Sequence, residues 1–170
     1  MVALVSDFEY IELEDLIRKL EGKEDARIFI LDKIEDPHNF GAIARSCNFF
    51  GIDAIIFPNR RAATVNDTVV KSSAGAIYDI DVCKVSNISQ SIEKLKEAGF
   101  WIYATDLEGE DIRECDFSGK AAVVIGNEGK GVSKNILKNS DKTITIPNFS
   151  DFDSLNASVA AAIVMYEIRR

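Results

Sequence analysis

Apolar positions along the chain fall into short continuous runs that alternate with segments of helical spacing. The continuous runs are typical of strands buried on both faces, and they cover residues 27–32, 54–57, 80–85, 101–105, 121–125 and 143–146. Segments with apolar residues three or four positions apart predict helices at residues 11–20, 39–50, 66–73, 89–98, 133–139 and 154–169. This alternation predicts an α/β fold, a doubly wound and mostly parallel sheet with helices on both faces.

The predicted sheet also indicates where to look for a site. Ligands of parallel sheets bind in the loops beyond the carboxyl ends of the strands. The informative loops are therefore those that follow Leu31, Thr105, Ile125 and Ile146. Any chemistry the chain performs is expected there.

Composition narrows the class of protein. The 170 residues are 46% hydrophobic and 28% charged, which fits one soluble domain and excludes intrinsic disorder. No apolar run approaches the roughly 18 residues of a membrane span, and residues 1–7 lack the basic start of a signal peptide. Cys47, Cys83 and Cys115 are odd in number and contain no C-x-x-C pair. We interpret them as buried small residues in a reducing cytoplasm, not as a zinc site or a disulfide framework.

The charge distribution limits how the chain can meet nucleic acid. The net charge is −8, which excludes a protein that coats nucleic acid through overall positive charge. Residues 1–36 hold eleven acids and five bases, a net of −6, so residues 37–170 carry only −2. A local basic patch in this larger part can still hold phosphate.

The loop after Leu31 leads into a predicted helix that carries polar residues at its start. Asn39 is a suitable helix cap, and Gly41 allows close approach of another backbone. Arg45 follows in the second turn, where it is either a functional cation or a surface arginine whose stem covers apolar neighbours. His38 is the only histidine, and we interpret it as a polar residue beside the cap, with a catalytic base as the alternative.

The loop after Ile125 reads Gly-Asn-Glu-Gly-Lys-Gly, and its glycines allow backbone N–H groups to face a ligand. It is not a P-loop, because Gly131 stands where Ser or Thr must hold Mg²⁺. It also lacks the third glycine of a dinucleotide fingerprint. Glu128, a carboxylate between glycines, is suited to hold an arginine or a hydroxyl group.

The loop after Ile146 leads into the last helix. Asp153 or Ser154 is expected to cap that helix, and its many alanines allow very close packing. The alternative to a functional Ser154-Leu155-Asn156 triplet is a capped, tightly packed terminal helix.

Together these loops resemble the three motifs of the SpoU/TrmH family, RNA 2′-O-ribose methyltransferases of the SPOUT superfamily. The matching segments are N-F-G-A-I-A-R at residues 39–45, V-I-G-N-E-G-K-G-V at 124–132 and I-P…S-L-N-A-S-V-A-A-A-I at 146–163. The resemblance runs from about Ile28 to Glu167. It implies a deep trefoil knot near the carboxyl terminus, a homodimer, and S-adenosylmethionine as the methyl donor, with no metal.

Residue roles follow from the resemblance at matching positions. It implies a reaction site of Arg45, Asn39, Glu128, Ser154 and Asn156. It implies cofactor contacts at Thr105, Gly126, Asn127, Ile146, Ser154 and Leu155. In the family the first-motif arginine is assigned as the base, but a guanidinium stays protonated above about pH 12. We therefore hold electrostatic positioning by Arg45 to be an equal alternative, with Glu128 holding that arginine.

The subtype resembles bacterial enzymes that methylate a guanosine of large-subunit ribosomal RNA. The supporting segments are 58–63, 71–76 and 99–101, and they suggest Arg60, Arg61 and Lys71 as RNA contacts. Those enzymes carry an amino-terminal RNA-binding domain, so residues 1–26 are interpreted as the linker that follows it and residues 27–170 as the methyltransferase domain. The alternatives are a tRNA ribose methyltransferase and a non-catalytic RNA-binding or ribosome-assembly module. The chain departs from the family at residues 148–153, which hold two aspartates and no glycine.

Overall fold

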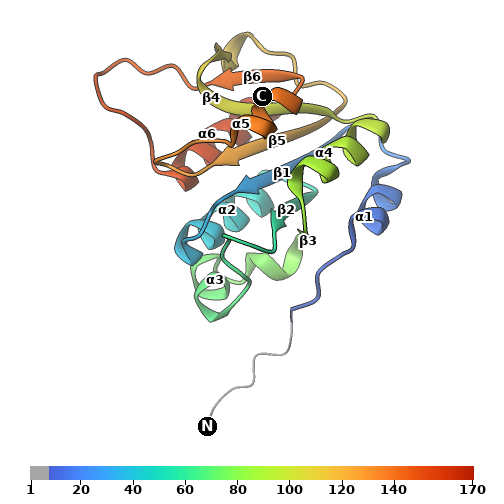
Figure 1. Cartoon of the computed structure of the whole chain (residues 1–170). Helices are drawn as coiled ribbons and strands as arrows, with labels where there is room; N and C mark the ends of the chain where they lie inside the picture. The colour runs from blue at the N-terminus through green and yellow to red at the C-terminus, as the bar shows by residue number, and fades with distance from the viewer. Residues whose placement is uncertain (1–7) are drawn as a thin grey trace.

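The computed structural model of the chain describes residues 8–170. Six parallel strands form one sheet in the order β3-β2-β1-β5-β4-β6 (Figure 1). The strands are β1 (Ala26–Asp32), β2 (Ala54–Pro58), β3 (Asp81–Val85), β4 (Trp101–Asp111), β5 (Lys120–Gly126) and β6 (Lys142–Thr145). The predicted parallel α/β sheet is confirmed.

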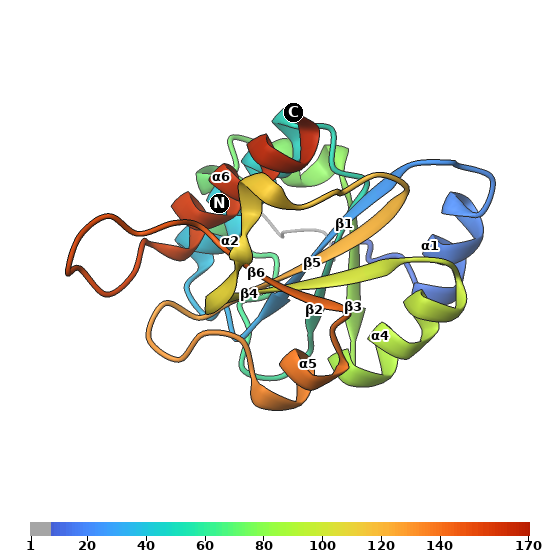
Figure 2. The same ribbon diagram turned by 90° about the horizontal axis from the view of Figure 1, so that it is seen from above.

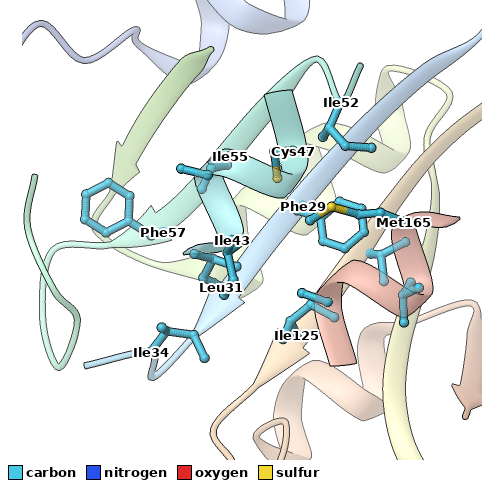
Figure 3. Packing of buried hydrophobic residues seen from close by; sticks show 14 of the residues in the cluster. Phe29, Leu31, Ile34, Ile43, Cys47, Ile52, Ile55, Phe57, Ile125 and Met165 are labelled. Carbon is cyan, nitrogen blue, oxygen red and sulfur yellow. The ribbon is translucent and has the colours of Figure 1, made fainter. Parts of the chain in front are cut away.

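Helices cover both faces of the sheet (Figures 1 and 2). One face carries α1 (Leu13–Leu20), α4 (Ile88–Glu97) and α5 (Lys134–Asn139), and the other carries α2 (Pro37–Phe49), α3 (Asp67–Ser72) and α6 (Ala157–Arg169). All seven residues of β1 are buried. Its side chains alternate between two cores: Phe29 and Leu31 pack beneath α2 and α6 (Figure 3), and Ile28 and Ile30 pack beneath α1 and α4. Burial on both faces explains the continuous apolar runs of the sequence.

The register of the two central strands positions the site. β1 and β5 align residue for residue, from Ala26 opposite Lys120 to Asp32 opposite Gly126. The loops after these two strands therefore start side by side, and they lead to helices on opposite faces. This is the switch point of a doubly wound sheet, where a crevice opens at the carboxyl edge.

One strand is longer than its hydrophobic pattern predicts. The apolar run ends at Thr105, but β4 continues to Asp111 and pairs again with β6 after a shift between Thr105 and Glu110. A side chain on Gly109 would overlap the backbone of Ile144, so the glycine permits this close pairing. Two short 3₁₀ turns, η1 (Ala76–Asp79) and η2 (Ile112–Glu114), were also not predicted, because single turns lack a hydrophobic period.

The amino-terminal segment packs as part of the domain from residue 8 onward. Leu16 of α1 is fully buried, and the backbone N–H of Ile11 donates to Val82 O at 2.9 Å. Residues 1–7, which were compared with the start of a signal peptide and form the first part of the expected linker, lie outside the described residues. The assignment of residues 1–26 as a linker after an RNA-binding domain stays a prediction.

The cysteines follow the sequence prediction at two of three positions. Cys47 and Cys83 are buried, and burial raises the pKa of the Cys83 thiol to about 12. Cys115 is only half-buried, with its Sγ donating to Asp111 O at 3.5 Å. Across residues 8–170, each helix is too short or too polar to cross a membrane.

Candidate active site

A cavity of about 430 Å³ opens beside residues 105–107 of β4 and the carboxyl ends of β5 and β6. Its apolar lining includes Ile125, Ile144 and Ile146, and the loop from β6 to α6 forms one wall. The volume lies within the range of small-molecule sites, roughly 300–1,000 Å³. All six residues predicted from the resemblance to contact the cofactor line it: Thr105, Gly126, Asn127, Ile146, Ser154 and Leu155.

The side chains of Thr105 and Asn127 form hydrogen bonds within the protein. Thr105 Oγ1 donates to Val124 O at 3.1 Å. Asn127 Oδ1 accepts from the backbone N–H groups of Gly129 and Lys130 at 2.8 and 3.3 Å, while its Nδ2 donates to Lys33 O at 3.2 Å. At these two positions the backbone is therefore what can contact a ligand. The Asn127 side chain holds the glycine-rich loop in its conformation.

The glycine-rich loop differs from its expected form. The sequence suggested that its backbone N–H groups face a ligand, but those of Gly129 and Lys130 face Asn127, and that of Gly131 donates to Asn127 O at 2.7 Å. Gly126 has a different requirement, because a side chain there would overlap the backbone of Gly131 and Val132. Its glycine is needed for the loop to close beside the cavity.

Glu128 joins the beginnings of two helices. Its Oε1 accepts from Asn39 Nδ2 at 3.0 Å, from Asn156 Nδ2 at 2.9 Å and from the backbone N–H of Ala157 at 3.1 Å. Asn156 Nδ2 also donates to Asn39 Oδ1 at 3.1 Å. A carboxylate at the amino end of α6 interacts favourably with the helix dipole. The predicted residues Asn39, Glu128 and Asn156 therefore form one network, from segments far apart in the sequence.

The helix caps are not those expected from the sequence. Asp36 caps α2 by accepting from the backbone N–H of His38 at 2.8 Å, and Pro37 occupies the first helical position. Asn39 therefore lies inside the first turn, and its amide is available to Glu128. Asn156, not Asp153 or Ser154, caps α6, and its Oδ1 accepts from the backbone N–H groups of Ser158 and Val159.

The remaining predicted reaction-site residues are placed differently. Ser154 lines the cavity, and its hydroxyl donates to Glu128 O at 3.3 Å. Arg45 is exposed on α2, outside the lining of the cavity, and the expected contact with Glu128 is not formed. Among residues 8–170 its guanidinium has no salt-bridge or hydrogen-bond partner. His38 is exposed, as a residue beside a cap would be.

The predicted RNA-binding cations lie over the β1–β2 side of the same edge. Arg60 and Arg61 follow β2, and Lys71 lies on α3, whose Ser72 hydroxyl contacts Pro37 O at 3.3 Å at the beginning of α2. All three are exposed. None forms a salt bridge within the described part of the chain, so their charges are available to phosphate.

A buried carboxylate that sequence reasoning missed holds the loop after β5. Asp32 is 4% exposed, and its Oδ2 accepts from the backbone N–H and the hydroxyl of Ser133 at 2.8 and 2.7 Å. The sequence feature that could have identified this carboxylate is an aspartate at the end of an otherwise apolar strand. Over residues 8–170, no three His, Cys, Asp or Glu side chains cluster as a metal site would require.

Known proteins are similar to this chain in sequence and fold. The chain is 43% identical over 172 residues to YacO of Bacillus subtilis (strain 168), named for the TrmH family of tRNA/rRNA methyltransferases, covering all of this chain and 69% of YacO. It is 30% identical to the SpoU methyltransferase AviRb of Streptomyces viridochromogenes, solved in complex with AdoMet, with a TM-score of 0.79 over 87% of this chain and 58% of that one.

A second AdoMet-bound structure, an rRNA methyltransferase from Sinorhizobium meliloti, is 28% identical, with a TM-score of 0.85 over 95% of this chain. The chain spans 61% of that protein, so it corresponds to a part of these longer solved chains. The sequence model of the SpoU rRNA Methylase family matches residues 26–166, which include all six strands. The second and third motifs line one cavity, and Asn39 of the first motif joins them through Glu128 and Asn156. The chain belongs to the SpoU rRNA methylase family.

Proposed function

We propose that this chain transfers a methyl group from S-adenosylmethionine to a ribose 2′-hydroxyl of RNA. The observation that carries the proposal is the convergence of three segments on one cavity. Residues 105–107 of β4 and the loops after β5 and β6 line it together, and the Asn39–Glu128–Asn156 network stands beside it. The family membership and the AdoMet-bound relatives support the same assignment.

The cavity fits the proposed cofactor. Its isoleucines offer apolar surface to an adenine ring, and Gly126 brings backbone close to the cavity without a side chain. Thr105, Ile146 and Leu155 would hold the cofactor against their backbone, with Asn127 keeping the loop in shape. When bound, S-adenosylmethionine supplies a methyl group that is already activated.

The protein's own task is then to align the ribose hydroxyl. In-line attack requires that the hydroxyl oxygen be held close to the methyl carbon. Ser154 and the network of Asn39, Glu128 and Asn156 would fix the geometry through hydrogen bonds. Arg45 would stabilise the developing negative charge of the hydroxyl oxygen as an exposed cation. The guanidinium group is a very weak acid in general, which favours this electrostatic role over that of a base.

The substrate is proposed to be a guanosine of large-subunit ribosomal RNA, reached through the exposed cations Arg60, Arg61 and Lys71. A transfer RNA is the alternative, because a TrmH/SpoU tRNA-modifying enzyme from A. aeolicus is 32% identical to this chain. Both substrates place the protein in the cytoplasm. A non-catalytic RNA-binding module would keep the fold but not transfer methyl groups.

The direct test is transfer of a labelled methyl group to unmodified large-subunit ribosomal RNA and, separately, to transfer RNA. We expect the ribosomal RNA to be labelled on a ribose oxygen, and calorimetry to show binding of S-adenosylmethionine but not of ATP. Tight ATP binding without methyl-donor binding would overturn the proposal. RNA binding without transfer would support the non-catalytic module.

We further propose a knotted carboxyl terminus and a homodimer formed through α2 and α6. The outer surface of this helix pair exposes Phe49, Val159 and Tyr166, and Tyr166 packs edge-on against Phe50. The inner face of α6, including Ala161 and Val164, is instead buried within the chain. Light scattering is expected to report twice 18.8 kDa, and a monomer that still methylates RNA would contradict the dimer.

A further inference from the structure

Two phenylalanines stand exposed on the loop between β6 and α6. The exposed fraction is 88% for Phe149 and 76% for Phe152, and both rings line the mouth of the cavity. This loop projects from the body of the molecule in both ribbon views (Figures 1 and 2). Leu107 and Leu155 extend the same apolar rim. Clusters of exposed apolar side chains around a cavity mark contact surfaces.

The loop has an internal scaffold. Asn148 Nδ2 donates to Phe152 O at 2.6 Å, and Asn148 Oδ1 accepts from the backbone N–H of Ser150 at 2.9 Å. The hydroxyl of Ser150 accepts in turn from the backbone N–H of Phe152 at 3.2 Å. The two rings are therefore presented by a shaped turn.

Charge divides the carboxyl edge into two sides. The β1–β2 side carries the exposed cations Arg60 and Arg61 near the exposed acids Glu35 and Asp36, and Lys130 lies on the loop after β5. The β4–β6 side exposes Asp106, Asp151 and Asp153. Within residues 8–170 these three acids form no salt bridge. Phosphates are attracted to the first side and repelled from the second. An RNA strand bound here would therefore direct its uncharged bases toward the two rings.

We propose that Phe149 and Phe152 stack on unpaired bases of the substrate RNA beside the methyl donor. This inference rests on the proposed function, since it takes RNA as the substrate. Exposed aromatic rings recognise single-stranded RNA by stacking on splayed bases, and the contact tolerates different base identities. The acidic flanks of the loop thus have a role, which is to exclude the phosphate backbone from the base side.

A tryptophan at either position reports stacking directly. The chain has a single tryptophan, Trp101, at the opposite end of β4, so F149W/W101F and F152W/W101F each carry one reporter. We expect single-stranded polyuridylate to quench the fluorescence of both variants, and its duplex with polyadenylate to quench it much less. The duplex presents phosphates but no free bases. The unaltered protein, with Trp101 as reporter, is the control and should respond to neither. Equal quenching by both RNAs would overturn the proposal.

Alanine variants distinguish base stacking from two other roles for the rings, which are covering the cofactor and forming a dimer interface. F149A/F152A should raise the KM for ribosomal RNA about tenfold or more, with kcat and methyl-donor affinity within about twofold. Y78A removes an aromatic ring that is 61% exposed elsewhere and should change neither. An equal loss of methyl-donor affinity would instead make the rings a cover for the cofactor, and a dimer that dissociates would make them an interface. Either result would overturn stacking.

The outcomes distinguish this inference from the proposed function. If the unaltered protein methylates RNA but the reporters show no selective quenching, stacking is wrong and the methyltransferase assignment stands. If quenching is selective for single strands but no RNA is methylated, stacking stands and the assignment fails.

Discussion

The two edges of the sheet differ in whether their cations are paired with carboxylates. At the amino edge, carboxylates hold cations and backbone N–H groups: Asp53 accepts from Lys23 Nζ at 2.6 Å and from the Arg27 N–H at 2.7 Å, and Asp81 accepts from Lys19 Nζ at 2.6 Å. At the carboxyl edge, Arg45, Arg60 and their neighbours have no carboxylate partner among residues 8–170. Glu128, at the same edge, accepts from neutral amides and a helix N–H and not from a cation.

The difference shows which charges are structural and which are available. Paired cations at the amino edge complete the folded surface and leave little field for a ligand. Unpaired cations at the carboxyl edge contribute little to packing, but they attract phosphate. α2 and α6 connect the two edges: Glu128 joins their beginnings, and Arg169 donates from Nε to Phe50 O at 2.7 Å near their ends. The two helices are thus joined near both ends, and their beginnings lie beside the cavity.

The largest expected effect is at Arg45. Arg45→Ala should lower single-turnover methyl transfer at least about a hundredfold while leaving methyl-donor affinity nearly unchanged, because one charge-stabilising group is lost. Arg45→Lys should retain more activity than Arg45→Ala if the role is electrostatic. Asn48→Ala, also exposed on α2, is the control. Near-normal rates in Arg45→Ala would make Arg45 an ordinary surface residue.

The next effect concerns the glycine-rich loop. Gly126→Ala should weaken methyl-donor binding at least about tenfold by calorimetry, since the new methyl group overlaps the backbone of Gly131 and Val132 and must displace the loop. Gly129→Ala is the matched control, because its added carbon meets only Asn127 Oδ1 at 3.5 Å, an ordinary contact. Equal affinities of the two variants would show that the loop does not shape the cofactor site.

A smaller effect should follow from removing carboxyl-edge cations. Arg60→Ala/Arg61→Ala/Lys71→Ala should weaken RNA binding and flatten its dependence on salt by about 2 in the log–log slope, if each cation neutralises one phosphate of a single strand. Lys19→Ala/Lys23→Ala removes paired cations of the amino edge and should leave the slope unchanged. The same slope change in both variants would erase the distinction between the edges.

The smallest effect is expected for an exposed ion pair away from the site. The hydrogen bond from Lys94 Nζ, at 2.6 Å, lowers the pKa of Glu14. The pair's stabilisation is therefore present above the ordinary pKa of a glutamate and is lost as the pH falls through the lowered value. Lys94→Met should slightly lower the melting temperature at neutral pH and not at about pH 2. Lys96 lies on the same helix and forms no salt bridge within residues 8–170, so Lys96→Met should show no such pH dependence. A pH-independent change would assign the effect to packing.

The hydrophobic pattern determined the elements of this fold because burial on both faces of β1 leaves a continuous apolar run, and burial on one face of a helix leaves a periodic one. The motifs identified the family, and all six predicted cofactor-lining residues do line the cavity. A strand extension such as residues 106–111 leaves no such trace, because it is mostly polar and exposed and pairs with β6 only at Glu110 and Asp111.

The sequence by itself therefore determined the α/β class, the family and the residues around the cavity. Only the tertiary structure decided their partners: Glu128 binds Asn39 and Asn156 and not Arg45, Asp36 and Asn156 cap the helices, and Asn127 shapes its own loop. The reason is physical. Periodicity records which side of an element is buried, whereas a hydrogen bond depends on distances of a few tenths of an ångström between segments that meet only after folding.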